Sequence, residues 1–249
     1  MQERAIGMVQ IGFKCNKGLV REKNEDACFV IPSHDVYIVA DGVGGNNSGE
    51  VASRTAVSEI ANYVTSNDLR ECREPDDIFG FFASAIDSAN GKIYRLGLEN
   101  EDNRGMATTV VTAYIYKSVA YIANLGDSRA YLFRGGTLSR ITKDHTYVNE
   151  LIDKGVITEE EAENHKQKNV ITRALGAEKS VEPDFYRLDV SRNDILMLCS
   201  DGLYGEVAPE KIAEILAGEG NMNDICTQLV DEAIRCGGRD NITVVCLKI

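Results

Sequence analysis

Short polar joints between strand-like runs restrict the fold of this chain more than any other feature. Lys117-Ser118 separates two runs rich in Val, Ile and Tyr, and Arg134-Gly135-Gly136 follows a third. Joints this short predict antiparallel hairpins rather than parallel crossovers. The strand-like runs are Ile6–Phe13, Ala27–Ile31, Val36–Ala40, Ala107–Tyr116, Val119–Asn124, Ala130–Phe133, Ile195–Cys199 and Ile242–Leu247.

Helical periodicity occupies other parts of the chain, which makes the expected fold class α+β, with helices packed on antiparallel sheets. Since no repeat, low-complexity tract or proline-rich linker divides the 249 residues, we expect one domain over residues 1–249. The polar stretch of residues 145–168 is predicted to form a flap-like surface insertion. The helical segments are Ser48–Thr65, Pro75 through Ile93, Pro209–Leu216, and Ile225 through Ile234 before a Gly237-Gly238 stop.

Charge and composition exclude several classes of function. With 27 basic and 39 acidic residues the formal net charge is −12, which argues against a general nucleic-acid or anionic-membrane binder. The first ten residues lack the pattern of a secretory signal, and no apolar run is long enough to span a membrane. Seven cysteines without a CxxC pair are typical of reduced thiols, so we expect a cytoplasmic protein.

Aspartates recur where a strand-like run meets a glycine-containing turn. They are Asp41 before Gly42, Asp127 after Gly126, Asp201 before Gly202, and Asp240 shortly before the last run, while Glu25-Asp26 precedes another run. Each one alone is explained by the preference of Asp and Gly for turns. If the strand ends converge, clustered carboxylates repel one another unless a cation neutralises them.

The donor atoms at these positions limit which metal ions could bind. They offer only hard oxygens, without a His pair or Cys pair at ligand spacing, which favours Mg²⁺ or Mn²⁺ over Zn²⁺. Arg21 stands four residues before Glu25, where a guanidinium beside such a cluster would clamp a phosphate. Taken alone, Arg21 would be read as an ordinary surface arginine.

Seven motifs in order give the chain a resemblance to a known family, the metal-dependent protein phosphatases of the 2C type in their short bacterial form. The resemblance covers nearly the whole chain, from about residue 6 to the end. The motifs are Arg21-x-x-Asn24-Glu25-Asp26, Asp41-Gly42-Val43-Gly44-Gly45, Met106-Ala107-Thr108-Thr109, Gly126-Asp127-Ser128-Arg129, Ile171-Thr172-Arg173-Ala174-Leu175-Gly176, Ser200-Asp201-Gly202-Leu203 and Asp240-Asn241-Ile242-Thr243.

The resemblance implies a four-layer α-β-β-α sandwich of two central antiparallel sheets flanked by helices, with two Mg²⁺ or Mn²⁺ ions in a cleft at one end. Asp41 would bridge both ions, Asp201 and Asp240 would complete the first, and the Gly42 carbonyl would serve the second. Arg21 would bind the substrate phosphate.

Three other acidic residues have implied roles around the same ions. Glu25 and Asp26 would hold metal-bound waters, and Asp127 would share a possible third, weaker ion with Asp201. The implied metal ligands are therefore Glu25, Asp26, Asp41, Gly42, Asp127, Asp201 and Asp240.

The implied activity is hydrolysis of phosphoserine and phosphothreonine in phosphorylated proteins, opposing a bacterial Ser/Thr kinase. Two cations would lower the pKa of a bridging water, and the hydroxide would attack phosphorus in line, with Arg21 and Asp41 as the catalytic residues. No phospho-enzyme is required, so Cys199 is expected to be a thiol of the core. Two other functions stay open: a non-catalytic metal- or partner-binding module, and a phosphatase of small phosphomonoesters.

Two positions depart from the family pattern. Val43 stands where some relatives have a histidine proposed as general acid, so a metal-bound water is expected to protonate the leaving group. The chain's histidines are His34, His145 and His165, of which His145 is interpreted as structural. Ala107 replaces the glycine usual before the paired threonines, at a position that is no ligand.

Overall fold

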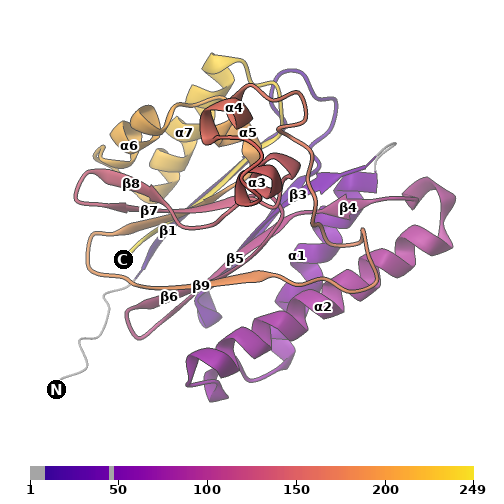
Figure 1. The fold of residues 1–249 in the computed structure, drawn as a ribbon. Coiled ribbons are helices and arrows are strands. Elements are labelled where there is room, and N and C mark those ends of the chain that lie inside the picture. The colour runs from indigo at the N-terminus through magenta and orange to yellow at the C-terminus, as the bar shows by residue number, and fades with distance from the viewer. Residues whose placement is uncertain (1–8, 45–47) are drawn as a thin grey trace.

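Two antiparallel β-sheets form the centre of the computed structural model, which describes residues 9–44 and 48–249 (Figure 1). The first sheet contains β1 (Gln10–Asn16), β7 (Arg129–Arg134), β8 (Thr137–Arg140), β10 (Ile195–Cys199) and β11 (Ile242–Lys248), in the order β1-β11-β10-β7-β8. The second contains β2 (Asp26–Ile31), β3 (Val36–Val43), β5 (Val110–Tyr116), β6 (Val119–Leu125) and β9 (Asp184–Asp189), in the order β2-β3-β5-β6-β9, and β4 (Ala107–Thr108) pairs with β3.

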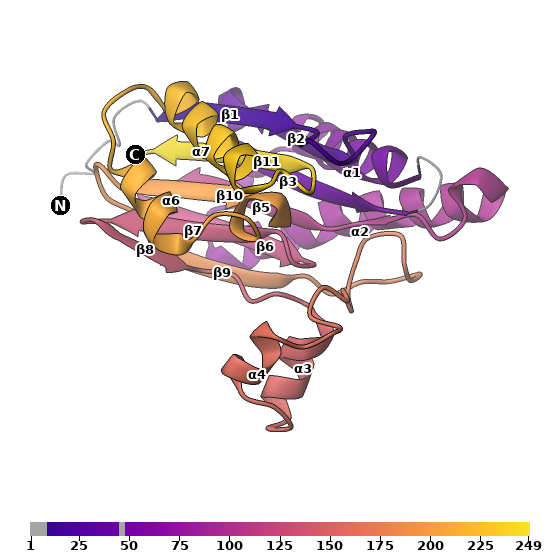
Figure 2. The ribbon, with the colours of Figure 1, turned by 90° about the horizontal axis from the view of Figure 1, so that it is seen from above.

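Helices cover the outer face of each sheet, as the view from above shows (Figure 2). α1 (Ser48–Ser66) and α2 (Pro75–Glu99) pack on the second sheet, and α6 (Pro209–Leu216) and α7 (Met222–Cys236) on the first. The alternation of β3 explains the layering, because Ile38 and Ala40 face the α1–α2 layer while Tyr37 and Val39 face the other sheet. The predicted α+β class and layered sandwich are confirmed.

The short joints form tight hairpins. Lys117 and Ser118, between β5 and β6, have φ values of 48° and 62°, and Gly135 and Gly136, between β7 and β8, have 57° and 86°. Two consecutive left-handed residues match the right-handed twist of the flanking strands. Both strand pairs are antiparallel, which confirms the prediction from the joints.

Several strand boundaries differ from those predicted. β1 runs to Asn16 instead of ending at Phe13, and residues 6–8 of the predicted strand lie outside the described residues. The run predicted over Ala107–Tyr116 is divided at Thr109, whose hydroxyl accepts a hydrogen bond from Asp41 N. The strands β8 and β9 were not predicted because polar residues interrupt their apolar ones, as is common at the edges of sheets.

The helical part of residues 145–168 stands away from the sandwich (Figure 2). These residues contain α3 (Tyr147–Asp153) and α4 (Glu159–Glu163), and a reciprocal capping box between Thr158 and Glu161 opens α4. That the segment acts as a flap stays a prediction. The remaining short helices are α5 (Asp201–Tyr204) and the 3₁₀ turns η1 (Pro32–His34), η2 (Leu69–Glu71) and η3 (Glu101–Asn103). In the described part of the chain, no helix has the length and apolar character needed to cross a membrane.

Candidate active site

Asp41 lies at the centre of the predicted carboxylate cluster. It pairs directly with Asp26 across the β2–β3 ladder, so the two aspartates are neighbours in the second sheet. Burial raises the pKa of Asp41 well above its ordinary value, and the charges of Asp26, Asp201, Asp127 and Asp240 raise it further, in that order. The structure therefore brings these five aspartates into one electrostatic neighbourhood, although they come from distant parts of the chain.

Two consecutive threonines hold the backbone of Asp41 in place. Thr108 Oγ1 donates to the Asp41 carbonyl at 2.8 Å, and Thr109 N donates to the same carbonyl at 2.9 Å. The Asp41 amide in turn donates to Thr109 Oγ1 at 3.0 Å. Thr109 Oγ1 also lies 2.7 Å from Ser128 Oγ, beside Asp127, which connects the two aspartate turns.

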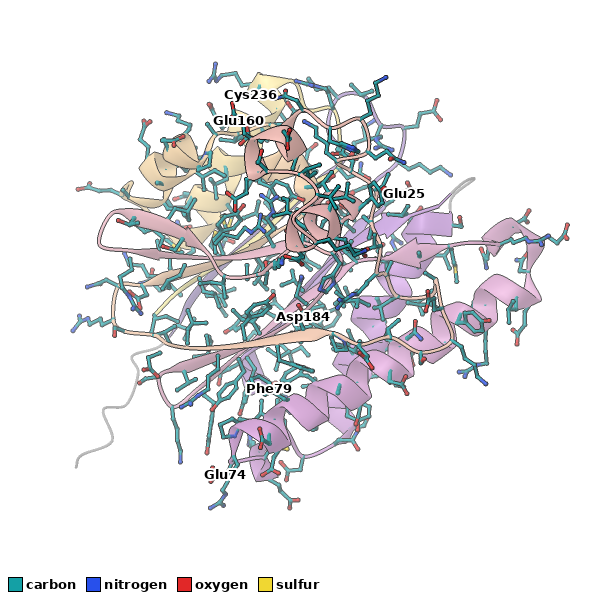
Figure 3. All side chains as sticks on the ribbon, viewed as in Figure 1. Glu25, Glu74, Phe79, Glu160, Asp184 and Cys236 are labelled. Atoms are coloured by element: carbon teal, nitrogen blue, oxygen red, sulfur yellow. The ribbon has the colours of Figure 1, made fainter. Side chains whose placement is uncertain are left out.

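Gly42 must be glycine because the backbone of α1 passes very close to it. A Cβ at this position would lie 2.1 Å from the Gly49 carbonyl oxygen and 2.6 Å from the Glu25 carbonyl oxygen. The Gly42 amide donates to that Glu25 carbonyl at 3.1 Å. The Glu25 side chain, labelled in Figure 3, also approaches the first turn of α1, because a Cβ on Gly49 would be 2.8 Å from Glu25 Oε1.

Two buried carboxylate oxygens of the cluster lack a hydrogen-bond partner, Asp26 Oδ1 and Asp201 Oδ1. The other oxygen of Asp26 accepts from Ser200 Oγ at 2.7 Å. Burial raises the pKa of Asp26 to about 8 and that of Asp201 to about 6. Unpaired, desolvated oxygens of this kind are costly unless a positive charge compensates them.

Asn241 fastens the loop of residues 17–25 to the end of the first sheet. Its Oδ1 accepts from Glu25 N at 2.7 Å, and its Nδ2 donates to the carbonyls of Lys17 and Lys23 at 2.9 and 2.8 Å. Arg21 lies on this loop, and its Nη2 donates to Asp240 Oδ2 at 2.7 Å. The adjacent residues Asp240 and Asn241 thereby position both Arg21 and the start of β2.

Asp127 follows Gly126, whose φ of 104° favours glycine. Burial raises the pKa of Asp127 to about 7, and the charge of Asp201 is the next cause. His145 braces this turn, since its Nδ1 accepts from Gly126 N at 3.1 Å and its own amide donates to the Gly126 carbonyl at 3.0 Å. This bracing agrees with the structural role predicted for His145.

A cavity of about 1240 Å³ separates part of the cluster from the α3–α4 segment. Asp127, Asp201 and Asp240 line one side, and residues of α3 and α4 line the other. Five basic and eight acidic side chains line it, and four of the basic ones are ion-paired with acidic ones: Arg129 and Arg140 with Asp144, Lys143 with Asp153, and Arg239 with Glu206. The cavity is larger than the ~300–1,000 Å³ usual for small-molecule sites.

The residues fit a divalent cation by charge and by donor type. They supply hard oxygens, two of them buried without partners, and burial together with the repulsion among them raises their pKa values. Within residues 9–44 and 48–249, no three or more His, Cys, Asp or Glu side chains are already arranged so that they could hold a metal ion. Asp240, one of the predicted ligands, is instead engaged by Arg21.

Three residues with clear positioning roles were not among the predicted site residues: Thr109, Ser200 and Asn241. Each stands beside a predicted residue or in one of the seven motifs. Their contacts reach across 68, 174 and 216 positions to Asp41, Asp26 and Glu25. Ser200 and Asn241 could have been found by their adjacency to an aspartate, and Thr109 by its place in the motif Met106-Ala107-Thr108-Thr109.

Comparisons with known proteins show the family to which the chain belongs. Residues 11–242 match the family model described as protein phosphatase 2C. The chain is 36% identical over 236 residues to a serine/threonine phosphatase stp of Listeria welshimeri, covering 94% of this chain and 93% of that protein. It is 38% identical over 215 residues to the protein phosphatase PhpP of Streptococcus pneumoniae, covering 84% and 83% of the two chains.

Solved structures are similar over nearly the whole length. Serine/threonine phosphatase Stp1 from Staphylococcus aureus superposes with a TM-score of 0.89 at 33% identity, covering 100% of this chain and 99% of that one. The catalytic domain of a serine/threonine protein phosphatase PstP, in complex with two manganese ions, gives a TM-score of 0.82 at 33% identity, covering 96% and 97%.

Proposed function

Because the chain belongs to the protein phosphatase 2C family and is a bacterial serine/threonine protein phosphatase, we propose that its reaction takes place at the carboxylate cluster around Asp41. The observation that carries this assignment is the convergence on Asp41 of the charges of Asp26, Asp127, Asp201 and Asp240. The four aspartates predicted from strand ends take part in it, together with Asp26, which precedes another strand.

The cluster would hold two Mg²⁺ or Mn²⁺ ions, in keeping with the two manganese ions in the solved PstP relative. When bound, such ions supply Lewis acidity that yields a hydroxide nucleophile near neutral pH and neutralises charge on the phosphoryl group. A third, weaker position would lie between Asp127 and Asp201, whose charges already influence each other. The ligands proposed for all these ions are Glu25, Asp26, Asp41, Gly42, Asp127, Asp201 and Asp240.

Arg21 would bind the phosphate, and its neighbours explain how it is positioned. Its guanidinium is half-exposed and reaches the cluster at Asp240, so it faces both solvent and the carboxylates. A guanidinium offers paired N–H groups that match two oxygens of a phosphate. Asn241 holds the backbone on both sides of Arg21, at Lys17 and Lys23.

A protein segment is the substrate that suits the cavity best. Its volume of about 1240 Å³ exceeds what a small phosphomonoester fills. We infer that a segment of a phosphorylated protein occupies it, and that a bacterial Ser/Thr kinase produces the phosphorylated proteins. All seven cysteines are free thiols, which supports a reducing compartment such as the cytoplasm.

Phosphate release from a phosphothreonine peptide and from p-nitrophenyl phosphate, with Mn²⁺ or with EDTA, tests this proposal. Asp201→Asn should lower Mn²⁺-dependent release from both substrates by at least about 100-fold. Asp231→Asn is the matched control, because it makes the same change at an exposed position on α7 and should leave release unchanged.

Three outcomes distinguish the alternatives. Release from the peptide that requires Mn²⁺ and Asp201 supports the proposed site. Release only from p-nitrophenyl phosphate indicates a phosphatase of small esters, and release from neither substrate indicates a non-catalytic module. Manganese binding measured by electron paramagnetic resonance gives a second readout, since Asp41→Asn should lower the number of bound ions even where activity is already lost.

A further inference from the structure

Two cysteines approach each other at the edge where the two sheets meet. Cys15 on β1 and Cys28 on β2 have their Sγ atoms 3.4 Å apart. β1 is the edge strand of the first sheet and β2 the edge strand of the second, so this contact joins the two sheets. Thr243 Oγ1 also lies within hydrogen-bond distance of Cys15 Sγ, at 3.3 Å, and fixes its orientation.

Solvent reaches this pair, unlike the thiols of the core. Cys15 is exposed and Cys28 is half-buried, whereas Cys199, Cys226 and Cys246 are buried. A shallow cavity of roughly 320 Å³ opens beside Cys28, bordered by the exposed side chains of Phe13 and Phe29. A small oxidant can therefore approach the pair without unfolding of the sandwich.

We propose that Cys15 and Cys28 form an intramolecular disulfide when the protein meets a hydroperoxide. A disulfide bond is about 2.05 Å long, so the two sulfur atoms must approach by little more than 1 Å from their present separation. The hydrogen bond from Cys28 lowers the pKa of Cys15 to about 7, which favours Cys15 as the attacking sulfur.

The chemistry proceeds in two balanced steps. The Cys15 thiolate attacks one peroxide oxygen, an S–O bond forms as the O–O bond breaks, and the other oxygen leaves with a proton as water or alcohol. Cys28 then attacks the sulfenic sulfur, an S–S bond forms, and the hydroxyl leaves as water with the Cys28 proton. The two sulfurs are oxidised and the peroxide is reduced, so no other reactant is needed.

The disulfide would close a covalent loop of the chain that contains functional residues. The two cysteines are 13 positions apart, and Arg21, Glu25 and Asp26 lie between them. Oxidation would thereby restrain the loop that Asn241 also fastens. The modification itself is independent of the proposed catalytic roles, so it can be tested whether or not those roles hold.

Peptide mapping of the full chain tests the proposal. Protein purified with a reductant is desalted, treated with hydrogen peroxide, quenched with catalase, and alkylated with N-ethylmaleimide in denaturant before trypsin digestion. We expect alkylated thiols to fall from seven to five, and residues 15–17 to be linked to residues 24–54. Dithiothreitol should separate the linked peptides and restore all seven thiols.

Three variants make the result specific. Cys15→Ser and Cys28→Ser should each abolish the link, and in Cys28→Ser dimedone should trap Cys15 as a sulfenic acid. Cys226→Ser, which removes a buried thiol on α7, should leave the link intact. The proposal is overturned if Cys15 and Cys28 of the unmodified protein stay as reactive toward N-ethylmaleimide as before peroxide, or if they are linked only between separate chains.

Discussion

Arg21 Nη2 lies 2.7 Å from Asp240 Oδ2, so the arginine predicted to bind phosphate is ion-paired with an aspartate predicted to bind metal. This ion pair links the proposed phosphate site to the proposed metal site, because a phosphate that binds Arg21 competes with Asp240 for the guanidinium. Both side chains are partly exposed, at 51% and 34%, so the pair itself adds at most about 1 kcal/mol to stability.

Arg21→Ala should therefore impair turnover without unfolding the protein. The loss of charge-assisted hydrogen bonds to phosphate should lower kcat/KM for a phosphothreonine peptide by about 10- to 100-fold. Arg21→Lys should recover only part of this, because an ammonium lacks the planar fork. Arg235→Ala, on the outer side of α7, is the control. An unchanged kcat/KM for Arg21→Ala would exclude Arg21 from phosphate binding.

Asn241→Ala should weaken both the fold and substrate binding. The change leaves Glu25 N and the carbonyls of Lys17 and Lys23 without their partner, at a cost of about 2–3 kcal/mol in the free energy of unfolding. Because the loop then loses its anchor, KM for the phosphopeptide should rise. Urea unfolding and steady-state kinetics measure the two effects, with the exposed Asn62→Ala as control. A stability equal to that of the unmodified protein would contradict this role.

Gly42→Ala and Gly80→Ala should have opposite effects on stability. At Gly42 the new methyl group would meet the Gly49 carbonyl at 2.1 Å, and we expect a loss of about 3 kcal/mol or more. At Gly80, inside α2, nothing lies within 4 Å of the added Cβ, and the better helix former should add about 0.5–1 kcal/mol. Urea unfolding of the two variants side by side checks both signs, and a stable Gly42→Ala would show that α1 can move away.

His145 should make stability depend on pH below neutrality. Burial lowers its pKa from the ordinary value, although Asp184 and Asp144 oppose the shift and Arg173 adds to it. The unfolded chain therefore gains a proton at His145 near pH 6.5, whereas the folded chain gains it only at a lower pH. The contribution of His145 to the free energy of unfolding is complete above about pH 6.5 and is lost as the pH falls below that value.

His145→Gln should flatten that pH dependence below about pH 6.5, as measured by the urea midpoint at several pH values. His34→Gln, at the η1 turn, should leave the slope in place. If both variants keep the slope of the unmodified protein, another group carries it.

Replacement of residues 158–168 by a short Gly-Ser linker should affect large substrates more than small ones. Glu159, Ala162, Glu163 and Lys168 border the large cavity from the α4 side. We expect a loss of turnover with a phosphoprotein and little change with p-nitrophenyl phosphate, whose retained hydrolysis also reports a folded site. Equal losses on both substrates would mean that the segment is part of the scaffold.

Local patterns in the sequence predicted much of the fold and of the candidate site. The joint Lys117-Ser118 specifies a hairpin because two left-handed residues reverse a chain without help from distant groups. The edge strand β9, Asp184–Asp189, escaped prediction because its residues form neither a continuous apolar run nor a strict alternation, and its pairing with β6 depends on a neighbour already in place. Asp41, Asp127 and Asp201 were visible because each adjoins a glycine at a strand end.

The sequence by itself determined which residue types could form a metal and phosphate site, and that the elements carrying them are antiparallel strands and amphipathic helices. Only the tertiary structure decided which side chains meet. Asn241 reaches Lys17 across 224 positions, and Cys15 reaches Cys28 across two different sheets. Such contacts depend on how the sheets pack and where their edges align, which no periodicity of 2 or 3.6 residues encodes. The same packing brings separate acidic turns together in one cluster, where burial and the neighbouring charges raise the pKa of Asp41.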